Sequence, residues 1–526
     1  MRPQFRSVTV RHPHDIHSPT STRHPQPDIR FTHYSSPTTV APMTPPSILY
    51  GLLLLITSCL YWLLPSRGLK LWLLVLSSLV FYGALQLQYV PLLLALVLAN
   101  YLIGRRLSAP LDWRIPNEEW HFAQQDWDRK RLVLMWVGIS LNVLLLLGFK
   151  YVTPMAATIN PSLQLLMPLG LSFFCFESIA YLVDIYRGAP AANHFIEFAA
   201  YKLFFPKLIA GPITRFQGYI SQMKRPQLPN LEQGVEAGWL IASGAAKKLL
   251  LADRLGLLVN LSFDNLERAG SGDIWLAIFA YGLQLYLDFS GYVDIARGSA
   301  LLLGIQLPQN FDFPYFTTSI AEFWRRWHIT LGDWLRNYLY FPMGGSRKGL
   351  SKTCINLLIV MVIAGIWHGD QWGFLIWGLL HGLALVVHRL NHTAADSLPR
   401  VKSFWSSWLG VISAWGMTQL FVFLSWVPFR LPNLQDMGLV VNHFFGQAAD
   451  IQFAQKVYTE SLGLNRVGIT LTLIGLTGTM TLLYGFKHRL KLQISWPLKL
   501  MFIPLGIYLA WLLAPTESAP YIYFEF

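Results

Sequence analysis

Two histidines, each set in a stretch of unusual composition, are the side chains of this sequence best suited to acid–base chemistry. His328 lies in "FWRRWHITLGDWLRNYLYFPMGGSRKG", residues 323–349, and His368 lies in "VIAGIWHGDQWGFLIWGLLHG", residues 362–382. Gly365 and Gly369 bracket His368, and glycine permits close approach of a substrate or of another helix. A neutral imidazole in such a place can act as a general base, which typically contributes about 10²- to 10⁴-fold to a rate. The alternative for His368 is a structural hydrogen bond at a helix break.

The stretch around His328 predicts one amphipathic helix. Its apolar side chains recur at spacings of three and four and form one stripe: Trp324, Trp327, Leu331, Trp334, Tyr338 and Phe341. The opposite arc is polar: Arg325, Arg326, Asp333, Arg336 and Asn337. Such a helix suits the membrane interface, so an interfacial anchor accounts for most of these residues. His328 stands at the border of the stripe and faces either a cavity or the headgroups.

The composition of the whole chain indicates a membrane protein. Of its 526 residues, 53% are hydrophobic and only 13% are charged, whereas soluble domains carry about 25% charged residues. Runs such as "ILYGLLLLITSCLYWLL" and "LVLMWVGISLNVLLLLGF" are long enough to cross a bilayer core, which needs about 20 apolar residues. The sequence therefore predicts an all-α, polytopic integral membrane protein.

The net charge of +13 comes from short basic loops between the apolar runs. Basic residues cluster in three such loops: Arg105, Arg106 and 129–131; Arg347, Lys348 and Lys352; Lys487, Arg489 and Lys491. The positive-inside rule makes these loops cytoplasmic, and no nucleic-acid partner is expected. The three cysteines show no disulfide framework and no zinc spacing.

Two regions are expected along the chain. Residues 1–46, rich in Pro, His, Ser and Thr, predict a disordered tail, and Met43 is a plausible alternative start. Residues 47–526 form one membrane domain of about 11 to 13 membrane helices, some of them re-entrant. The apolar runs are 47–65, 70–86, 89–104, 132–150, 163–185, 196–212, 235–262, 273–303, 353–367, 371–390, 404–428, 467–485 and 497–514. The loop near 431–465 lacks a basic excess and is expected to face outward.

Charged residues inside the run 273–303 require partners. Gln284 and Asp288 share one helix face, and Asp294 and Arg297 are three apart and able to pair. Charges buried in a membrane protein are paired or mark a substrate path. The first interpretation is a structural network, and the second is a lining of the substrate tunnel.

Several ordered motifs resemble those of the membrane-bound O-acyltransferase family. The two histidine segments match its signatures, and further similarity lies in "FFPKLIAGPITRF" (204–216), in residues 284–311 and in the ending "YIYFEF". The chain is most similar to the bacterial branch that contains the membrane subunit of alginate O-acetylation. The teichoic acid D-alanylation membrane protein is more distantly similar. The resemblance covers most of residues 47–526.

The resemblance implies a fold, a reaction and a site. It implies a ring of tilted helices around a central tunnel, with His368 as the catalytic base and His328 as the second catalytic residue. Asp370 departs from the family pattern, which has a small or apolar residue beside the base. Substrate contacts are expected from these side chains: Trp324, Arg325, Arg326, Trp327, Asp288, Gln284, Trp367 and Arg336.

The same resemblance implies the substrates and partners. The donor is acetyl-CoA or an acyl-carrier thioester on the cytoplasmic side, and neither a bound cofactor nor a metal is expected. The acceptor is an exported polysaccharide, reached with an extracytoplasmic esterase-like partner protein. The location is the plasma (inner) membrane, within the lipid bilayer.

Other functions remain open from the residues alone. The intramembrane charges also suit a transporter of an envelope precursor, and a non-catalytic scaffold would need the aromatic stretch only as an anchor. D-alanyl transfer of the teichoic-acid type is a further alternative. No G-x-S-x-G elbow and no P-loop occurs in the sequence, so a serine hydrolase and an NTPase lack support.

Overall fold

The computed structural model describes residues 43–45, 47–110, 117–160, 165–515 and 519–524, and all regular elements in these ranges are helical. The all-α class predicted from the sequence is therefore confirmed. The predicted tail, residues 1–46, lies outside the described residues except for 43–45.

Among the described residues, six helical segments are long and apolar enough to cross a membrane. They are Arg67–Leu107, Trp120–Ala156, Leu350–His368, Trp372–Ser397, Trp408–Arg430 and Arg466–Arg489. Two shorter apolar helices are Ile48–Leu63 and Trp496–Leu512. This confirms a multi-spanning membrane protein.

One predicted span is not a continuous helix. The apolar run 196–212 begins as α7 (Phe195–Lys202) and continues as a buried, non-helical segment up to Arg215. Pro206 and Pro212 explain the difference, because proline lacks the N–H that a helix interior needs. An apolar run therefore marks burial here, and it does not mark a crossing.

The first group of helices brings together the two basic segments 105–106 and 129–131. It consists of α1 (Ile48–Leu63), α2 (Arg67–Gln86), α3 (Val90–Leu107), α4 (Asn117–Leu147), α6 (Leu171–Tyr186) and α8 (Phe216–Lys224). Arg131 of α4 donates from Nε to the carbonyl of Leu107 and from Nη2 to those of Ile185 and Tyr186. The C-terminal ends of α3 and α6 thus lie beside the basic stretch 129–131 in the middle of α4.

A second group packs backbone against backbone. It contains α9 (Leu231–Ala246), α10 (Asp253–Phe263), α11 (Ser271–Leu302) and α21 (Trp496–Leu512). A Cβ at Gly244 would lie 2.6 Å from the carbonyl oxygen of Gly291, and a Cβ at Gly298 would lie 2.6 Å from that of Ala237. Glycines permit this close approach of α9 and α11, as is common between membrane helices.

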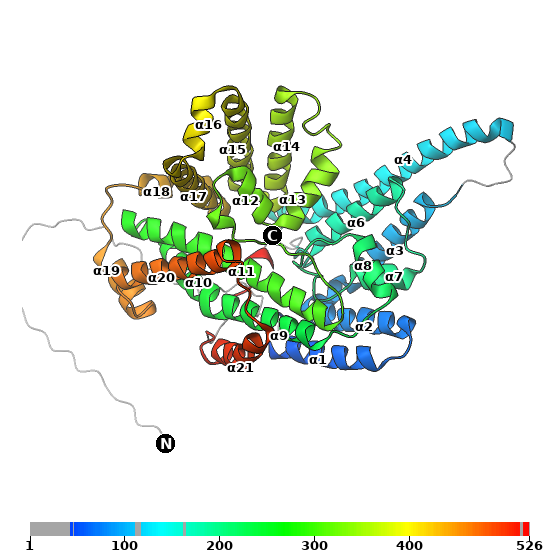
Figure 1. The fold of residues 1–526 in the computed structure, drawn as a ribbon, viewed down its shortest axis with the longest axis horizontal. Coiled ribbons are helices and arrows are strands. Elements are labelled where there is room, and N and C mark those ends of the chain that lie inside the picture. Colours follow the sequence, from blue (N-terminus) through cyan, green and yellow to red (C-terminus); the bar gives the residue numbers. More distant parts are fainter. Residues whose placement is uncertain (1–42, 46, 111–116, 161–164, 516–518, 525–526) are drawn as a thin grey trace, which may run out of the picture.

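The third group carries the two histidine segments. It comprises α12 (Ile320–Arg326), α13 (Ile329–Leu335), α14 (Leu350–His368), α15 (Trp372–Ser397), α16 (Pro399–Ser406) and α17 (Trp408–Arg430). Helices α14 and α15 pack closely where Gly365 has no side chain. A Cβ at this position would lie only 2.4 Å from the carbonyl oxygen of Phe374. Figure 1 shows these helices on one side of the molecule, with α9 and α11 on the other.

The last elements lead the chain back to the centre. They are α18 (Leu434–Asn442), α19 (Ile451–Ala454), α20 (Arg466–Tyr484) and, after α21, the short turn Ile522–Phe524. In Figure 1 the C-terminal end lies in the middle of the view, with α11, α12 and α13 around it. The segment Tyr521–Phe524 is buried or half-buried there.

Candidate active site

The predicted helix over the aromatic stretch is broken at His328. Helix α12 ends at Arg326, His328 has left-handed backbone angles (φ 43°, ψ 53°), and α13 begins at Ile329. Trp327, Leu331 and Trp334 of the predicted stripe are buried inside the protein. The single amphipathic helix was therefore wrong, and His328 lies in the core instead of at the border of the stripe.

Asn310 causes this break. Its backbone carbonyl accepts from the N–H of Ile329 at 3.0 Å, and its side-chain Oδ1 accepts from the N–H of Thr330 at 3.0 Å. The hydroxyl of Thr330 donates to the same Oδ1 at 2.9 Å. Both N–H groups belong to the start of α13, where a helix leaves its donors without internal partners. Asn310 thus stabilises the turn that positions His328.

The same contacts define the hydrogen-bonding state of His328. Nδ1 of His328 lies 3.3 Å from Oδ1 of Asn310. That Asn310 atom must be an oxygen, because a backbone N–H donates to it, so Nδ1 must carry the hydrogen. In the neutral ring Nε2 then holds a lone pair. This Nε2 is buried and has no hydrogen-bond partner within the described part of the chain.

His368 stands at the opposite end of α14 from the basic loop that precedes the helix. It is the last residue of α14 and is only 3% exposed. Its ring lies 4.5 Å from that of Trp367, 5.0 Å from Trp377 and 4.9 Å from Phe429, measured between centroids. Asp370, the departure from the family pattern, is exposed beyond the helix end. The predicted base is therefore enclosed by aromatic rings.

Tyr523 joins the two histidines. Its ring centroid lies 5.9 Å from that of His328 and 6.2 Å from that of His368, and it stacks on Phe289 at 3.8 Å. Sequence reasoning did not assign a site role to this residue. The available signal was the aromatic ending "YIYFEF" after the last apolar run. The structure thus brings His328, His368 and Tyr523 into one cluster.

A buried ion network holds the C-terminal segment in this place. Lys248 pairs with Asp288 at 2.8 Å and with Asp253 at 2.9 Å, and all three side chains are at most 3% exposed. Asp288 also accepts from the backbone N–H of Ile522 at 3.0 Å, and Lys248 donates to the carbonyl of Pro520 at 3.2 Å. Asp288, predicted to contact substrate, therefore has the contacts of the structural network instead.

We expect Lys248→Met to destabilise the protein strongly. The substitution leaves Asp253 and Asp288 buried without their counter-charge, and loss of one partner of a buried pair costs about 3–5 kcal/mol. The melting temperature of the purified protein in detergent measures this effect. The control is Lys499→Met, because Lys499 pairs with Glu236 where both side chains are 20–39% exposed. An equal melting temperature for the two variants would contradict the structural role.

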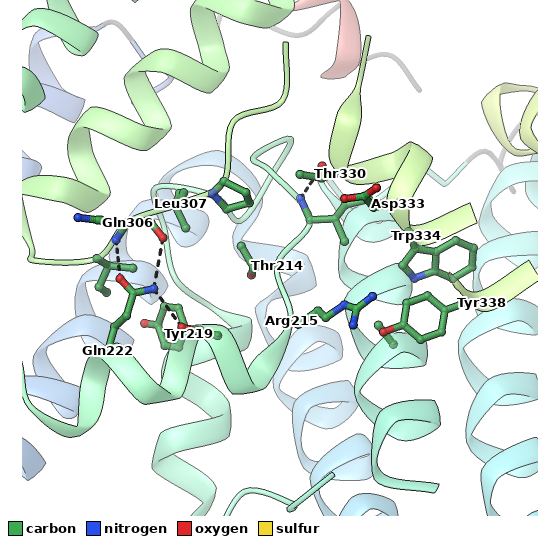
Figure 2. A pocket seen from close by; sticks show the side chains of 15 residues that line it. Thr214, Arg215, Tyr219, Gln222, Gln306, Leu307, Thr330, Asp333, Trp334 and Tyr338 are labelled. Atoms are coloured by element: carbon green, nitrogen blue, oxygen red, sulfur yellow. Dashed lines mark hydrogen bonds between the residues drawn. The ribbon is translucent and has the colours of Figure 1, made fainter. Parts of the chain in front are cut away.

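A cavity of about 470 Å³ lies beside the His328 turn. Figure 2 shows its labelled side chains, with Arg215, Asp333, Trp334 and Tyr338 on one side and Gln222 and Gln306 on the other. Thr330 lines this cavity and, through Asn310, is joined to His328. Arg215 lies over the ring of Tyr338, at 5.7 Å.

The cavity lies at the end of the molecule that carries the basic loops. Tyr338 in its wall donates to Asp184 of α6, and Arg187 just after α6 donates to the carbonyl of Asn337. This end of α6 is the one bound by Arg131. The positive-inside rule predicts that this end faces the cytoplasm.

A much smaller cavity of about 30 Å³ lies toward the other end of α6. Gly170, Phe173 and Tyr523 are part of its wall. The aromatic layer with the histidines thus lies between the two cavities.

The remaining residues predicted to bind substrate lie in different places. Trp367 adjoins His368, and Trp327 packs in the core against Phe323 and Trp426. Trp324 donates to the buried His381, and Gln284 lies against Gly256. Of the three arginines, Arg325 is exposed and Arg326 pairs with Glu322 at 2.7 Å. Arg336 is exposed and pairs at 2.6 Å with Asp333 of the cavity wall. Within the described ranges, no group of three or more His, Cys, Asp or Glu side chains could hold a metal ion.

Comparison with known proteins identifies the family. A sequence profile described as "MBOAT, membrane-bound O-acyltransferase family" matches residues 184–427. The "Probable alginate O-acetylase AlgI" of Pseudomonas putida is 35% identical over 438 residues, covering 79% of this chain and 84% of that protein. The chain belongs to the membrane-bound O-acyltransferase family. Its predicted class, an O-acyltransferase of the membrane, is thereby confirmed.

Two further relatives in this family act on envelope polymers, by their names. The "Peptidoglycan O-acetyltransferase" of Helicobacter pylori is 36% identical and covers 72% of this chain and 74% of that protein. The "Teichoic acid D-alanyltransferase" of Streptococcus thermophilus is 32% identical, but over only 44% of this chain. The transporter and scaffold alternatives receive no support from these members of the O-acyltransferase family. The roles of His328 and His368 stay predictions.

Proposed function

We propose that this protein transfers acetyl groups from a cytoplasmic thioester toward an exported polysaccharide, across the plasma (inner) membrane. The observation that carries the proposal is the cluster of His328, His368 and Tyr523, which is joined from His328 through Asn310 to Thr330 in the wall of the cavity of about 470 Å³. The acetyl group and the polymer class are inferred from the alginate and peptidoglycan O-acetyltransferase relatives.

The donor, acetyl-CoA or an acyl-carrier thioester, enters the cavity from the cytoplasm. Arg215 and Arg187 are exposed at that end and offer charge to the phosphates that such donors carry. In the reaction a hydroxyl oxygen attacks the thioester carbonyl, the C–S bond breaks, and the thiol leaves. His368 takes the hydroxyl proton and returns it to the leaving sulfur.

His328 contacts the same hydroxyl whose proton His368 takes. Its Nε2 lone pair suits it to accept a hydrogen bond from the attacking hydroxyl, whereas its Nδ1–H is engaged by Asn310. Two buried indole N–H groups beside His368, those of Trp367 and Trp377, have no hydrogen-bond partner in the described residues. Donors of this kind stabilise the oxyanion that develops in acyl transfer. These two tryptophans thus stabilise the oxyanion, and His328 acts as a hydrogen-bond acceptor.

An extracytoplasmic esterase-like protein completes the transfer to the polymer. The support for this partner is the family resemblance and the position of the site between two cavities at opposite ends of α6. The acceptor hydroxyl at the site belongs to this partner or to the polymer.

Base-labile acids released from envelope polysaccharide test the function. We expect acetate to be absent from a gene-deletion strain and restored by the wild-type gene. Equal acetate in both strains would overturn the proposal. Release of D-alanine in place of acetate would also overturn it, in favour of the teichoic-acid type of reaction.

We expect Arg215→Glu to weaken donor binding without removing the chemistry. The new carboxylate repels the donor phosphates at the cavity mouth, so KM for the thioester should rise about tenfold while kcat changes little, which corresponds to about 1.4 kcal/mol. Thioester consumption by membrane vesicles gives both constants. Lys224→Glu, on the exposed end of α8, controls for a general loss of positive charge. An unchanged KM for Arg215→Glu would exclude this cavity as the donor entrance.

A further inference from the structure

A buried lysine binds the helix that ends in His368. Lys150 follows α4 in the π-helical turn Gly148–Val152 and is only 8% exposed. It belongs to the membrane-spanning segment Trp120–Ala156, where a charged side chain is costly and needs a reason. None of the roles assigned above uses this residue.

The partners of Lys150 supply that reason. Its Nζ donates to the backbone carbonyl of Trp367, the residue just before His368. Nζ also lies over the Trp367 ring, 5.6 Å from its centroid. The hydroxyl of the neighbouring Tyr151 lies within hydrogen-bond distance of the carbonyls of Ile366 and Gly369, the latter at 3.1 Å, and these two acceptors share its single hydrogen. Two consecutive side chains thus contact three of the four carbonyls of residues 366–369 at the end of α14, with only that of His368 left out.

The geometry of both helices explains why these contacts form. The last carbonyls of an α-helix have no intrahelical partner, and the C-terminal end carries a partial negative charge that favours a cation. A π-helical turn shifts the direction of the side chains that follow it, and such turns often occur at functional sites. Here the turn directs two successive residues, Lys150 and Tyr151, toward one target helix.

We propose that Lys150, with Tyr151, is a positioning residue that fixes the catalytic His368 by holding the carbonyl end of α14. The inference rests on the proposed function, in which His368 is the base. These donors bind the backbone of Trp367 and Gly369, on both sides of His368. The backbone of His368 is therefore fixed, and its imidazole is held at one position relative to the hydroxyl. Displacement of a catalytic group by about 1 Å can cost about 100-fold in rate.

The test compares four variants in membrane vesicles, with acetyl-CoA thioester consumption as the readout and membrane levels matched. For Lys150→Met we expect a fall in kcat of about 10- to 100-fold, with KM for the thioester within about twofold of wild type. Lys150→Arg should recover most of kcat, because its guanidinium also donates to a carbonyl. Tyr151→Phe should lower kcat in the same way. Lys130→Met, in an exposed pair on the same α4, should leave kcat unchanged.

The outcomes separate positioning from simple stabilisation. A wild-type kcat for Lys150→Met would overturn the proposal, and so would a fall in kcat fully matched by a fall in folded protein. If Lys150→Met does not accumulate in the membrane, Tyr151→Phe decides, because it removes the hydroxyl donor at the helix end without burying or removing a charge. Activity that survives His368→Ala would instead refute the proposed function, independently of Lys150.

Discussion

Replacing His368 by alanine should abolish acetyl transfer, with a loss of about 10²- to 10⁴-fold at matched membrane levels. The substitution removes the imidazole at the end of α14, which lies inside a wall of aromatic side chains. Thioester consumption by membrane vesicles measures the loss.

A second substitution at this position separates chemistry from packing. His368→Gln retains much of the side-chain volume but has no basic nitrogen, so it should be as inactive as His368→Ala. His388→Ala is the matched control, because His388 is a half-buried histidine on α15 that lies beside His392 and away from the site. A rate near that of wild type for His368→Gln would exclude His368 as the base.

Replacing His328 by asparagine should lower acetyl transfer by at least about 100-fold while the protein still folds. Asparagine tolerates the left-handed backbone of this position better than most residues, and its side-chain N–H₂ replaces the Nδ1–H donor to Asn310. What the variant lacks is the Nε2 acceptor, which is buried and unpartnered in the described residues. The same vesicle assay measures the rate, and the melting temperature in detergent reports on the fold.

His328→Ala serves as the comparison for this variant. It removes both nitrogens and the contact with Asn310, and it leaves a non-glycine residue at φ 43° without the local hydrogen bond. We therefore expect His328→Ala to lose melting temperature as well as activity. If His328→Asn kept activity within about threefold of wild type, the role of Nε2 on the proton path would be wrong.

The apolar periodicity of the sequence predicted the membrane class because a bilayer imposes it directly. Long runs without charge are typical of membrane-spanning helices. The structure has six segments of sufficient length and apolarity among its described residues. The pairing of Asp294 with Arg297 also followed from their spacing, and the two side chains lie 3.8 Å apart. Local spacing is enough where the partners share one helix.

The break at His328 could not be predicted from local spacing. The acceptors that replace the helical ones come from Asn310, before the preceding helix, and no pattern within residues 323–349 contains that information. Arg325 and Arg336 are exposed, as their place on the predicted polar arc indicates, and their expected contact with substrate rests on the family resemblance alone.

Tyr523 and Lys150 were missed for a related reason. Their contacts with the histidine cluster join segments that are far apart in the sequence, and only the packed structure brings these together. A lysine inside an apolar run is a signal that the sequence does contain, since such a charge needs a partner at membrane depth. Its partner is a backbone carbonyl, however, and backbone acceptors leave no trace in residue types.

Sided thioester consumption by proteoliposomes of the purified protein tests the central claim most directly. Acetyl-CoA is supplied either to the face that carries the basic loops or to the opposite face, and free thiol is measured for wild type, His368→Ala and His328→Asn. We predict thiol release by wild type only, and only from the basic face. Release from the opposite face, or release by His368→Ala at a rate near that of wild type, would contradict acyl transfer at this histidine cluster.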